Sequence, residues 1–224
     1  MGYYSENLAG ARLKQCYDIA PPRVKQYLEA EIRHVLSLVE PEDSVLELGC
    51  GYGRVTREIA KVAGRAVGID TARESLELAG NEARGEACEY LEMDASRLKF
   101  DDDEFDVVVC VQNGICAFGL DPETLVREAV RVARPGGRVL FSTYSGKFWP
   151  HRLRWFELQA ERGLVGEIDY EASGNGVIAC KDGFRAGAMA EEDFRDLCAH
   201  IGVECGISEI DESSLFCEII KSGE

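Results

Sequence analysis

Strand-like and helix-like segments alternate along most of this chain, and the alternation limits its possible folds more than any other feature. The clearest strand is the almost unbroken apolar run FDVVVCV at 105–111, which is typical of a strand buried on both faces of a parallel sheet. Six further strand-like runs lie at 44–49, 65–70, 88–94, 138–144, 203–210 and 214–220. The pattern predicts an α/β fold with a doubly wound, mostly parallel sheet of seven strands, which binds ligands beyond the carboxyl ends of its strands.

The remaining segments complete a single predicted domain of 224 residues. Its four parts are an N-terminal helical lid, a ligand-binding core, an inserted helix and hairpin, and a C-terminal helix with a strand pair, at 1–39, 40–144, 145–189 and 190–224. The lid has two helix-like pieces that separate at Pro21–Pro22. The inserted helix is expected at 149–162 and the hairpin around Gly174–Gly176.

Charge and hydropathy exclude several classes of partner. The chain has 41 acidic and 25 basic residues, a formal charge of -16, and such a surface repels the phosphates of nucleic acids. Its apolar runs are shorter than a bilayer span, and its first residues lack the basic-then-apolar order of a signal peptide. We therefore expect a cytoplasmic protein that binds a small molecule and associates with neither nucleic acid nor membrane.

The nine cysteines do not indicate a disulfide framework or a metal site. Their number is odd and no CxxC pair occurs. Four lie in apolar contexts, at Cys50, Cys110, Cys198 and Cys217. The other five lack the spacing of metal ligands, at Cys16, Cys88, Cys116, Cys180 and Cys205. We interpret all nine as reduced and mostly buried thiols and expect no metal.

The stretch VLELGCGYG at 45–53 places Glu47 in a strand and three glycines at alternate positions after it. Glycine permits positive φ and lets the backbone approach a ligand closely. Arg54 stands where the third glycine of a dinucleotide fingerprint belongs, and no G-K-[ST] follows, so neither NAD nor a P-loop is indicated. Asp70 ends the next strand about twenty residues later, where an acid can accept both hydroxyls of a ribose.

These motifs resemble those of class I S-adenosylmethionine-dependent methyltransferases. ELGCGYG is similar to the first motif of that family, an acidic residue followed by G-x-G-x-G, and four further fragments follow in the family's order. They are GID, MDAS, FDVVVC and ARPGGRVLFS, at 68–70, 93–96, 105–110 and 133–142. The resemblance covers residues 40–144 and the C-terminal helix with its two strands.

The resemblance implies S-adenosyl-L-methionine as the cofactor. Glu47 and the backbone of Gly49 and Gly51 would hold its amino-acid end, Asp94 its adenine amino group, and the Ala95 N–H its ring. The complete set implied for the cofactor is Glu47, Gly49, Cys50, Gly51, Asp70, Thr71, Asp94, Ala95, Val111 and Gln112. The aromatic residues expected to reach the sulfonium from the lid are Tyr3, Tyr4 and Tyr17. Packing of these rings against the sheet is the alternative.

The implied reaction is methyl transfer to a small molecule by in-line displacement, for which no base is obligatory. His151, Gln112 and Asn113 are the catalytic candidates, and Asn113 resembles the asparagine-containing turn of the glycine N-methyltransferase-like branch. A loop that only connects strand to helix explains Gln112 and Asn113 equally well.

The acceptor site is expected under KFWPHRLRW at 147–155, which contains both tryptophans and a basic island of Lys147, Arg152 and Arg154. An acceptor with a carboxylate or another anionic group would suit an arginine fork. The residues predicted to contact it are Tyr144, Trp149, His151, Arg152, Arg154 and Trp155. A solvated helix face with two buried aromatic rings would give the same pattern.

Three other functions remain open on the same motifs. One is a non-catalytic or regulatory protein that binds S-adenosylmethionine, since a fold alone does not establish chemistry. Another is a nucleotide-dependent oxidoreductase, which a rise in melting temperature with NAD would reveal. The third, a thiol-dependent metalloid methyltransferase, needs a set of thiol ligands that the cysteine spacing does not show.

Overall fold

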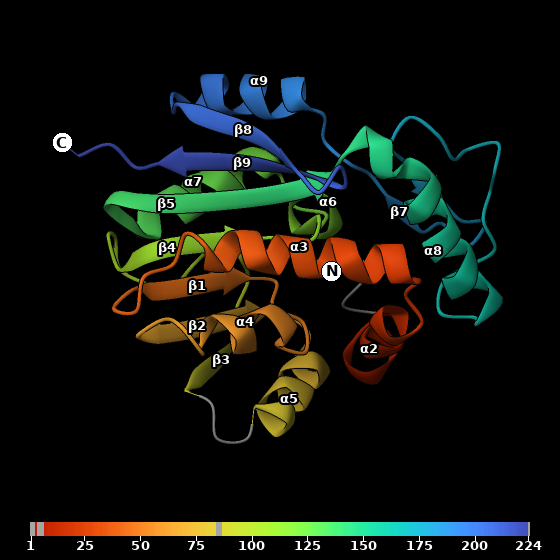
Figure 1. Cartoon of the computed structure of the whole chain (residues 1–224), viewed down its shortest axis with the longest axis horizontal. Helices are drawn as coiled ribbons and strands as arrows, with labels where there is room; N and C mark the ends of the chain where they lie inside the picture. Colours follow the sequence, from red (N-terminus) through yellow and green to blue (C-terminus); the bar gives the residue numbers. More distant parts are fainter. Residues whose placement is uncertain (1–2, 4–6, 84–86, 224) are drawn as a thin grey trace.

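The computed structural model describes residues 3, 7–83 and 87–223, and a seven-stranded sheet forms its centre (Figure 1). The strand order is β3-β2-β1-β4-β5-β9-β8. The strands are β1 (Ser44–Leu48), β2 (Arg65–Asp70), β3 (Cys88–Glu92), β4 (Phe105–Cys110), β5 (Ala133–Tyr144), β8 (Cys205–Ile210) and β9 (Ser214–Ile220). Only β9 is antiparallel to its neighbours, β5 and β8. The predicted mostly parallel seven-stranded sheet is thus confirmed.

Helices cover both faces of the sheet. α3 (Pro22–Leu36) and α4 (Arg54–Ile59) lie in front of it in Figure 1, whereas α7 (Pro122–Val132) lies behind. α7 packs beside α9 (Glu191–Ile201), which covers β8. α7 begins with Pro122 in its first turn, and the Asp121 carboxylate caps it by accepting a 2.9 Å hydrogen bond from the Thr124 N–H.

The two N-terminal helices differ in what they cover. α3 packs on the sheet through Val35, whereas Val24 and Leu28 are buried in a cluster with Tyr144 and with Phe148 and Trp155 of the segment after β5, and, among the described residues, none of α3 lines the cavity described below. α2 (Gly10–Asp18) instead packs against α5 (Arg73–Glu82), where the Gly10 N–H donates to Ser75 Oγ at 2.9 Å. Residues 22–36 are therefore not part of a lid. Of the lid predicted at 1–39, only the segment around α2 is still a candidate. No helix in the described residues is both long and apolar enough to cross a bilayer.

The insertion after β5 contains the short helix η1 (Gly146–Phe148), α8 (Trp149–Glu161) and the two-stranded pair β6 (Ile178–Ala179) and β7 (Arg185–Ala186). The predicted turn is present, since Gly174 and Val177 exchange two backbone hydrogen bonds of 2.9 Å. Pairing between the two predicted segments is present but irregular, as an isolated antiparallel bridge of Ile168 with Cys180 and a 2.9 Å hydrogen bond from the Asp169 N–H to the Ala179 carbonyl, whereas the β6–β7 ladder lies after the turn. The cause is Asp169, whose carboxylate accepts the N–H groups of Glu171 and Ala172 and bends the segment that was expected to be the first strand.

Candidate functional site

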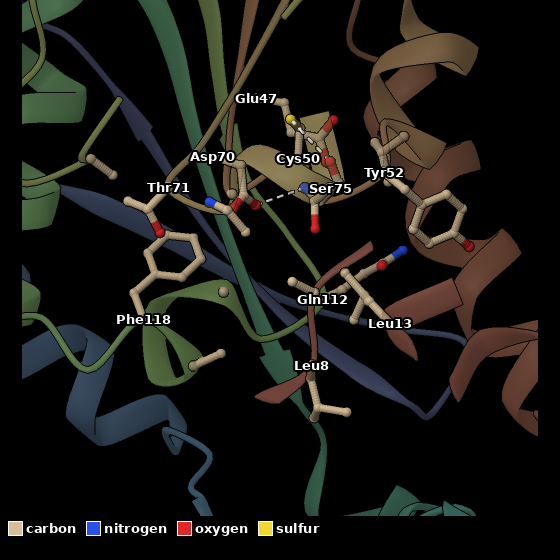
Figure 2. Close-up of a pocket in the computed structure, with 18 of the residues that line it drawn as sticks. Leu8, Leu13, Glu47, Cys50, Tyr52, Asp70, Thr71, Ser75, Gln112 and Phe118 are labelled. Carbon is tan, nitrogen blue, oxygen red and sulfur yellow. Dashed lines mark hydrogen bonds between the residues drawn. The ribbon is translucent and has the colours of Figure 1, made fainter. Parts of the chain in front are cut away.

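A cavity of about 990 Å³ lies at the carboxyl ends of β1, β2 and β4, where α2 and α8 also reach it (Figure 2). This is the edge at which doubly wound sheets bind their ligands, and the volume is at the upper end of small-molecule sites. All ten residues predicted for the cofactor line it: Glu47, Gly49, Cys50, Gly51, Asp70, Thr71, Asp94, Ala95, Val111 and Gln112. Two residues of the predicted acceptor set, Tyr144 and Trp155, line it as well.

The glycine loop forms the part of the cavity wall that follows β1. Gly49, Gly51 and Gly53 have φ of 73°, 53° and 77°, a left-handed conformation that other residues adopt only with strain. A Cβ on Gly49 would lie 2.2 Å from Phe118 Cζ, and one on Gly51 would lie 2.9 Å from Leu13 Cδ2. The bare backbone of the loop thus faces Leu13 of the N-terminal segment and Phe118, and both side chains line the cavity.

Asp70 joins the glycine loop to the start of α5. Its Oδ2 accepts the Gly51 N–H at 2.9 Å and its Oδ1 accepts the Ala72 N–H at 2.8 Å. The N-cap of α5 is Ala72, whose own N–H is the one that Asp70 accepts. Burial raises the pKa of Asp70, against the lowering effect of these backbone hydrogen bonds. Each carboxylate oxygen retains a lone pair for a further donor.

Glu47 is a buried acid behind the loop. It is 4% exposed, and its carboxylate accepts a hydrogen bond from Thr56 Oγ1 of α4. Burial raises the pKa of Glu47 to about 7, although the Thr56 hydrogen bond and the Arg54 guanidinium lower it. Its protonation state is therefore sensitive to any cation that enters the cavity near neutral pH.

A second buried acid supports the loop after β4. Glu31 of α3 accepts the Gln112 N–H at 2.8 Å and Ser214 Oγ–H at 2.6 Å, and burial raises its pKa to about 7. Gln112 has a φ of 56° and its N–H also lies 2.8 Å from Ser142 Oγ. Its Nε2 is buried without a hydrogen-bond partner among the described residues. Glu31 thus holds Gln112 in a strained backbone conformation at the cavity wall.

We expect Glu31→Gln to change how stability depends on pH. Because burial raises the folded pKa of Glu31 to about 7 from 4.5, its stabilising contribution is complete below pH 4.5 and is lost as pH rises through 7. The free energy of unfolding of the variant, relative to wild type, should therefore increase by about 2 kcal/mol between pH 5 and pH 8. Urea unfolding at both pH values measures this, with Glu29→Gln on the exposed face of α3 as control. If the free energies of unfolding of Glu31→Gln and wild type changed equally between the two pH values, the raised pKa of Glu31 would be refuted.

Three aromatic rings and one cation form a cluster that begins in the glycine loop itself, at Tyr52. Tyr17 of α2 makes edge contacts with Tyr52 and Trp155, both with ring centroids 5.8 Å apart. The Arg54 guanidinium lies 4.9 Å from the Tyr17 ring centroid, and its Nη2 is buried without a hydrogen-bond partner among the described residues. All four residues line the cavity. The sequence analysis did not predict Arg54 as a site residue. Its position directly after G-x-G-x-G could have indicated it, because the residue that follows a ligand-binding loop lies near the ligand.

Other lining residues that sequence reasoning did not identify come from α8 and from the segment around α6 (Gly114–Ala117). They include Phe156 and Gln159 of α8 and Phe118, the C-cap of α6. The helical pattern at 149–162 did not show which of its faces would meet the cavity. Phe118 follows a loop without a motif, so no sequence signal was available for it.

The structure does not bring the predicted basic island to the cavity. Arg152 is 1% exposed and donates to the carbonyls of Gly176, Ala186 and Gly187 at 2.7, 2.7 and 2.9 Å. Arg154 is exposed and forms ion pairs with two glutamates of its own helix. Lys147 is paired with Glu209. Each of these charges is therefore occupied by a neighbouring group, which corrects their predicted role in gripping an anionic acceptor.

Three further candidates also lie apart from the cavity. His151 is exposed and packs against Phe148, with ring centroids 5.6 Å apart, so it does not face the site as a base. Trp149 lines a separate depression beside Arg152. The Asn113 amide is occupied, because Nδ2 donates to the Gly187 carbonyl at 3.0 Å and Oδ1 accepts from Thr143 Oγ at 2.8 Å. Asn113 thus ties the loop after β4 to the insertion and is not free for catalysis.

The tyrosines predicted for a lid have different positions. Tyr17 lines the cavity together with Leu8, Ala9, Leu13 and Cys16 from the same segment. Tyr3 donates to the Asp182 carboxylate at 2.7 Å and packs against Phe184 of the insertion. Tyr4 lies outside the described residues. The segment around α2 thus covers part of the cavity, whereas the described Tyr3 is directed to the insertion.

Comparison with known proteins connects this site to one kind of domain. Residues 46–141 match the family model described as a methyltransferase domain. Ubiquinone biosynthesis O-methyltransferase of Coxiella burnetii is 28% identical over 144 residues, 63% of this chain and 57% of that protein. The enzyme of the same name from Methylococcus capsulatus is 36% identical over 101 residues, 44% of this chain and 42% of that protein. The matches thus span about half of these curated relatives.

Solved structures share the fold over nearly the whole chain. The PH0226 protein of Pyrococcus horikoshii has a TM-score of 0.66 at 20% identity, covering 92% of this chain and 94% of its own. Magnesium protoporphyrin IX methyltransferase from Synechocystis, solved with bound SAH, has a TM-score of 0.64 at 17% identity, covering 94% and 93%. At these identities the likeness establishes the fold.

Proposed function

We propose that this protein transfers a methyl group from S-adenosyl-L-methionine to a small-molecule acceptor in the described cavity, because residues 46–141 match the family model described as a methyltransferase domain and solved methyltransferases share the fold. The observation that carries the proposal is that Asp70 and the glycine loop, at the ends of neighbouring strands, line one cavity. The cofactor supplies a methyl group that its sulfonium makes electrophilic. The protein then has to bind, align and desolvate the two reactants.

The residues around the glycine loop suit the polar ends of this cofactor. The Asp70 carboxylate has lone pairs left to accept ribose hydroxyls. Asp94 is exposed at the cavity, with Oδ1 accepting from Ser96 N–H at 2.8 Å, so it can also accept from an adenine amino group. The buried Glu47 can accept an ammonium group, which would favour its ionised form. These roles follow from the resemblance to the family and from the positions of the residues in the cavity.

Two buried donors without partners supply the remaining polar contacts. Arg54 Nη2 and Gln112 Nε2 are on residues that line the cavity, and neither has a hydrogen-bond partner among the described residues. Burying such a donor without a partner costs about 1–3 kcal/mol, more for a charged group, so a ligand acceptor at this place would relieve the cost. We propose that Arg54, and not Arg152 or Arg154, binds the carboxylate or other anionic group of a reactant.

The acceptor would lie on the aromatic side of the cavity. Tyr17, Trp155 and Phe156 offer ring surface to a flat or apolar body. Burial raises the pKa of Tyr17, so its hydroxyl stays protonated near neutral pH and acts as a donor, not as a base. Hydroxyl acceptors are the first class to screen, because the curated relatives are named O-methyltransferases. The glycine N-methyltransferase-like branch stays a prediction.

Formation of S-adenosylhomocysteine tests the proposal. Small aromatic hydroxy and amino compounds, with and without a carboxylate, are incubated with the protein and S-adenosylmethionine, and the product is quantified. Turnover with at least one acceptor is expected. If the protein binds the cofactor but forms no product, even when cell extracts are supplied as the source of acceptor, the non-catalytic alternative is favoured. If NAD raises the melting temperature and S-adenosylmethionine does not, an oxidoreductase is favoured.

Arg54→Gln is expected to lower kcat/KM for the active acceptor by at least about tenfold, because it removes a charged donor from the cavity. Arg162→Gln is the matched control, since Arg162 is exposed at the end of α8. Binding measurements then show which reactant Arg54 contacts: a raised cofactor Kd assigns it to the cofactor, and a raised acceptor KM alone to the acceptor. Equal kinetics for both variants would refute the role of Arg54.

A further inference from the structure

Three cysteines that the sequence separates come together at one edge of the fold. Cys198 is on α9, Cys205 on β8 and Cys217 on β9. Their Sγ atoms all lie within 4.8 Å of one another, and the Cys198 and Cys217 sulfurs are 3.8 Å apart. Their spacing in the sequence did not indicate this cluster, because two neighbouring strands and the helix that covers them supply one thiol each.

The sheet register explains why the thiols converge. In the β8–β9 ladder Cys205 pairs with Ile219, whereas Cys217 pairs with Ile207, so the two cysteines are diagonal neighbours. Residues two positions apart on a strand share a face, and this places both thiols on one face of the sheet. α9 packs on β8 and brings Cys198 to the same place.

The distances match those of a metal–thiolate site. With Zn–S bonds of about 2.3 Å, two sulfurs on one ion are about 3.8 Å apart in a tetrahedral site and about 4.0 Å apart in a trigonal one. The Cys198–Cys217 separation of 3.8 Å already has this value, and the remaining separations, at most 4.8 Å, require only small side-chain rotations. A disulfide would instead need the sulfurs to approach to about 2.05 Å.

We propose that Cys198, Cys205 and Cys217 bind one thiophilic divalent cation with filled d orbitals, of the class of Zn²⁺ and Cd²⁺. Each thiol releases its proton to solvent when it becomes a ligand, so binding one ion releases up to three protons. Cys198 and Cys217 are buried, whereas Cys205 is only partly buried, which leaves an access route and a fourth coordination position on the Cys205 side.

This site is separate from methyl transfer. None of the three cysteines is among the described residues that line the cavity. Phe194 and Val203 lie in or against the same apolar core as the cysteines, so the site is surrounded by packed side chains. A bound ion would join α9 to the C-terminal strand pair and would stabilise this edge of the sheet, as structural metal sites do.

Cadmium titration of the fully reduced protein tests the proposal. The ultraviolet charge-transfer band of Cd²⁺ bound to thiolate should saturate at one ion per chain, and competition with a chromophoric chelator gives the affinity for Zn²⁺. Saturating Zn²⁺ should raise the melting temperature by roughly 3 °C or more. No saturable band, or an affinity too weak to compete with the chelator, would overturn the proposal.

Cysteine variants locate the ion. Cys205→Ser removes the partly exposed ligand with the least disturbance of the core, and it should lower the affinity for Cd²⁺ at least tenfold and abolish the rise in melting temperature. Cys88→Ser is the matched control, because Cys88 is also partly buried but lies on β3. It should bind one ion as wild type does. Wild-type affinity in Cys205→Ser, with cooperative unfolding confirming its fold, would overturn the proposal.

Discussion

Replacing Asp70 by alanine is expected to reduce the affinity for S-adenosylmethionine by at least tenfold, about 1.4 kcal/mol or more. Asp70 ends β2 at the cavity, and its carboxylate has lone pairs available beyond the two backbone N–H groups that it accepts. Two ribose hydroxyls would donate charge-assisted hydrogen bonds to this carboxylate. Such bonds are stronger than hydrogen bonds between neutral groups. Isothermal titration calorimetry measures the loss directly.

Two controls separate binding from loop damage. Asp196→Ala removes an exposed acid of α9 and should bind the cofactor as wild type does. Asp70→Asn keeps one oxygen that can accept the Gly51 or Ala72 N–H, so it should retain the thermal stability better than the affinity. An Asp70→Ala variant with wild-type affinity would contradict the assignment of Asp70 to the ribose.

Arg152→Ala is expected to destabilise the protein by about 3 kcal/mol or more, because it removes the guanidinium donor from the buried Gly176 and Ala186 carbonyls and leaves the Gly187 carbonyl with Asn113 Nδ2 alone. The guanidinium donates to Gly176, Ala186 and Gly187, and it also lies 4.2 Å from the Tyr144 ring centroid. Urea unfolding measures the loss, which corresponds to a fall in melting temperature of roughly 6–12 °C.

Arg154→Ala is the matched control, from the same helix and the same predicted basic island. Its exposed ion pairs with Glu157 and Glu161 are screened by solvent, so the variant should unfold at nearly the wild-type urea concentration. If both variants were equally stable, and Arg152→Ala instead raised the KM for the acceptor, the original interpretation of Arg152 as an acceptor ligand would be restored and the structural role would be wrong.

The cavity wall at the strand ends, which we propose to hold the cofactor, could be predicted from sequence because local patterns determine it. Apolar runs such as 105–111 identify buried parallel strands, and the carboxyl ends of parallel strands meet at one edge. A motif that directly follows a strand therefore comes to the cavity whatever the rest of the chain does. Glu47, Asp70 and Gln112, from three different strand ends, line one cavity for this reason.

The acceptor side could not be predicted in the same way, because it depends on contacts between distant segments. The carbonyl partners of Arg152 are 24 to 35 residues further along the chain, and no local pattern distinguishes an arginine that binds them from one that faces a ligand. The same holds for Cys198 and Cys217, whose contact depends on how α9 packs on the sheet.

Calorimetric titration of the wild-type protein with S-adenosylmethionine, and in parallel with NAD, tests the central claim most directly. We expect one molecule of S-adenosylmethionine per chain with a Kd in the micromolar range, about the scale of many enzyme–substrate pairs, and no heat of binding for NAD. A protein that unfolds cooperatively but binds NAD and not S-adenosylmethionine would contradict the claim that this cavity is a methyltransferase site.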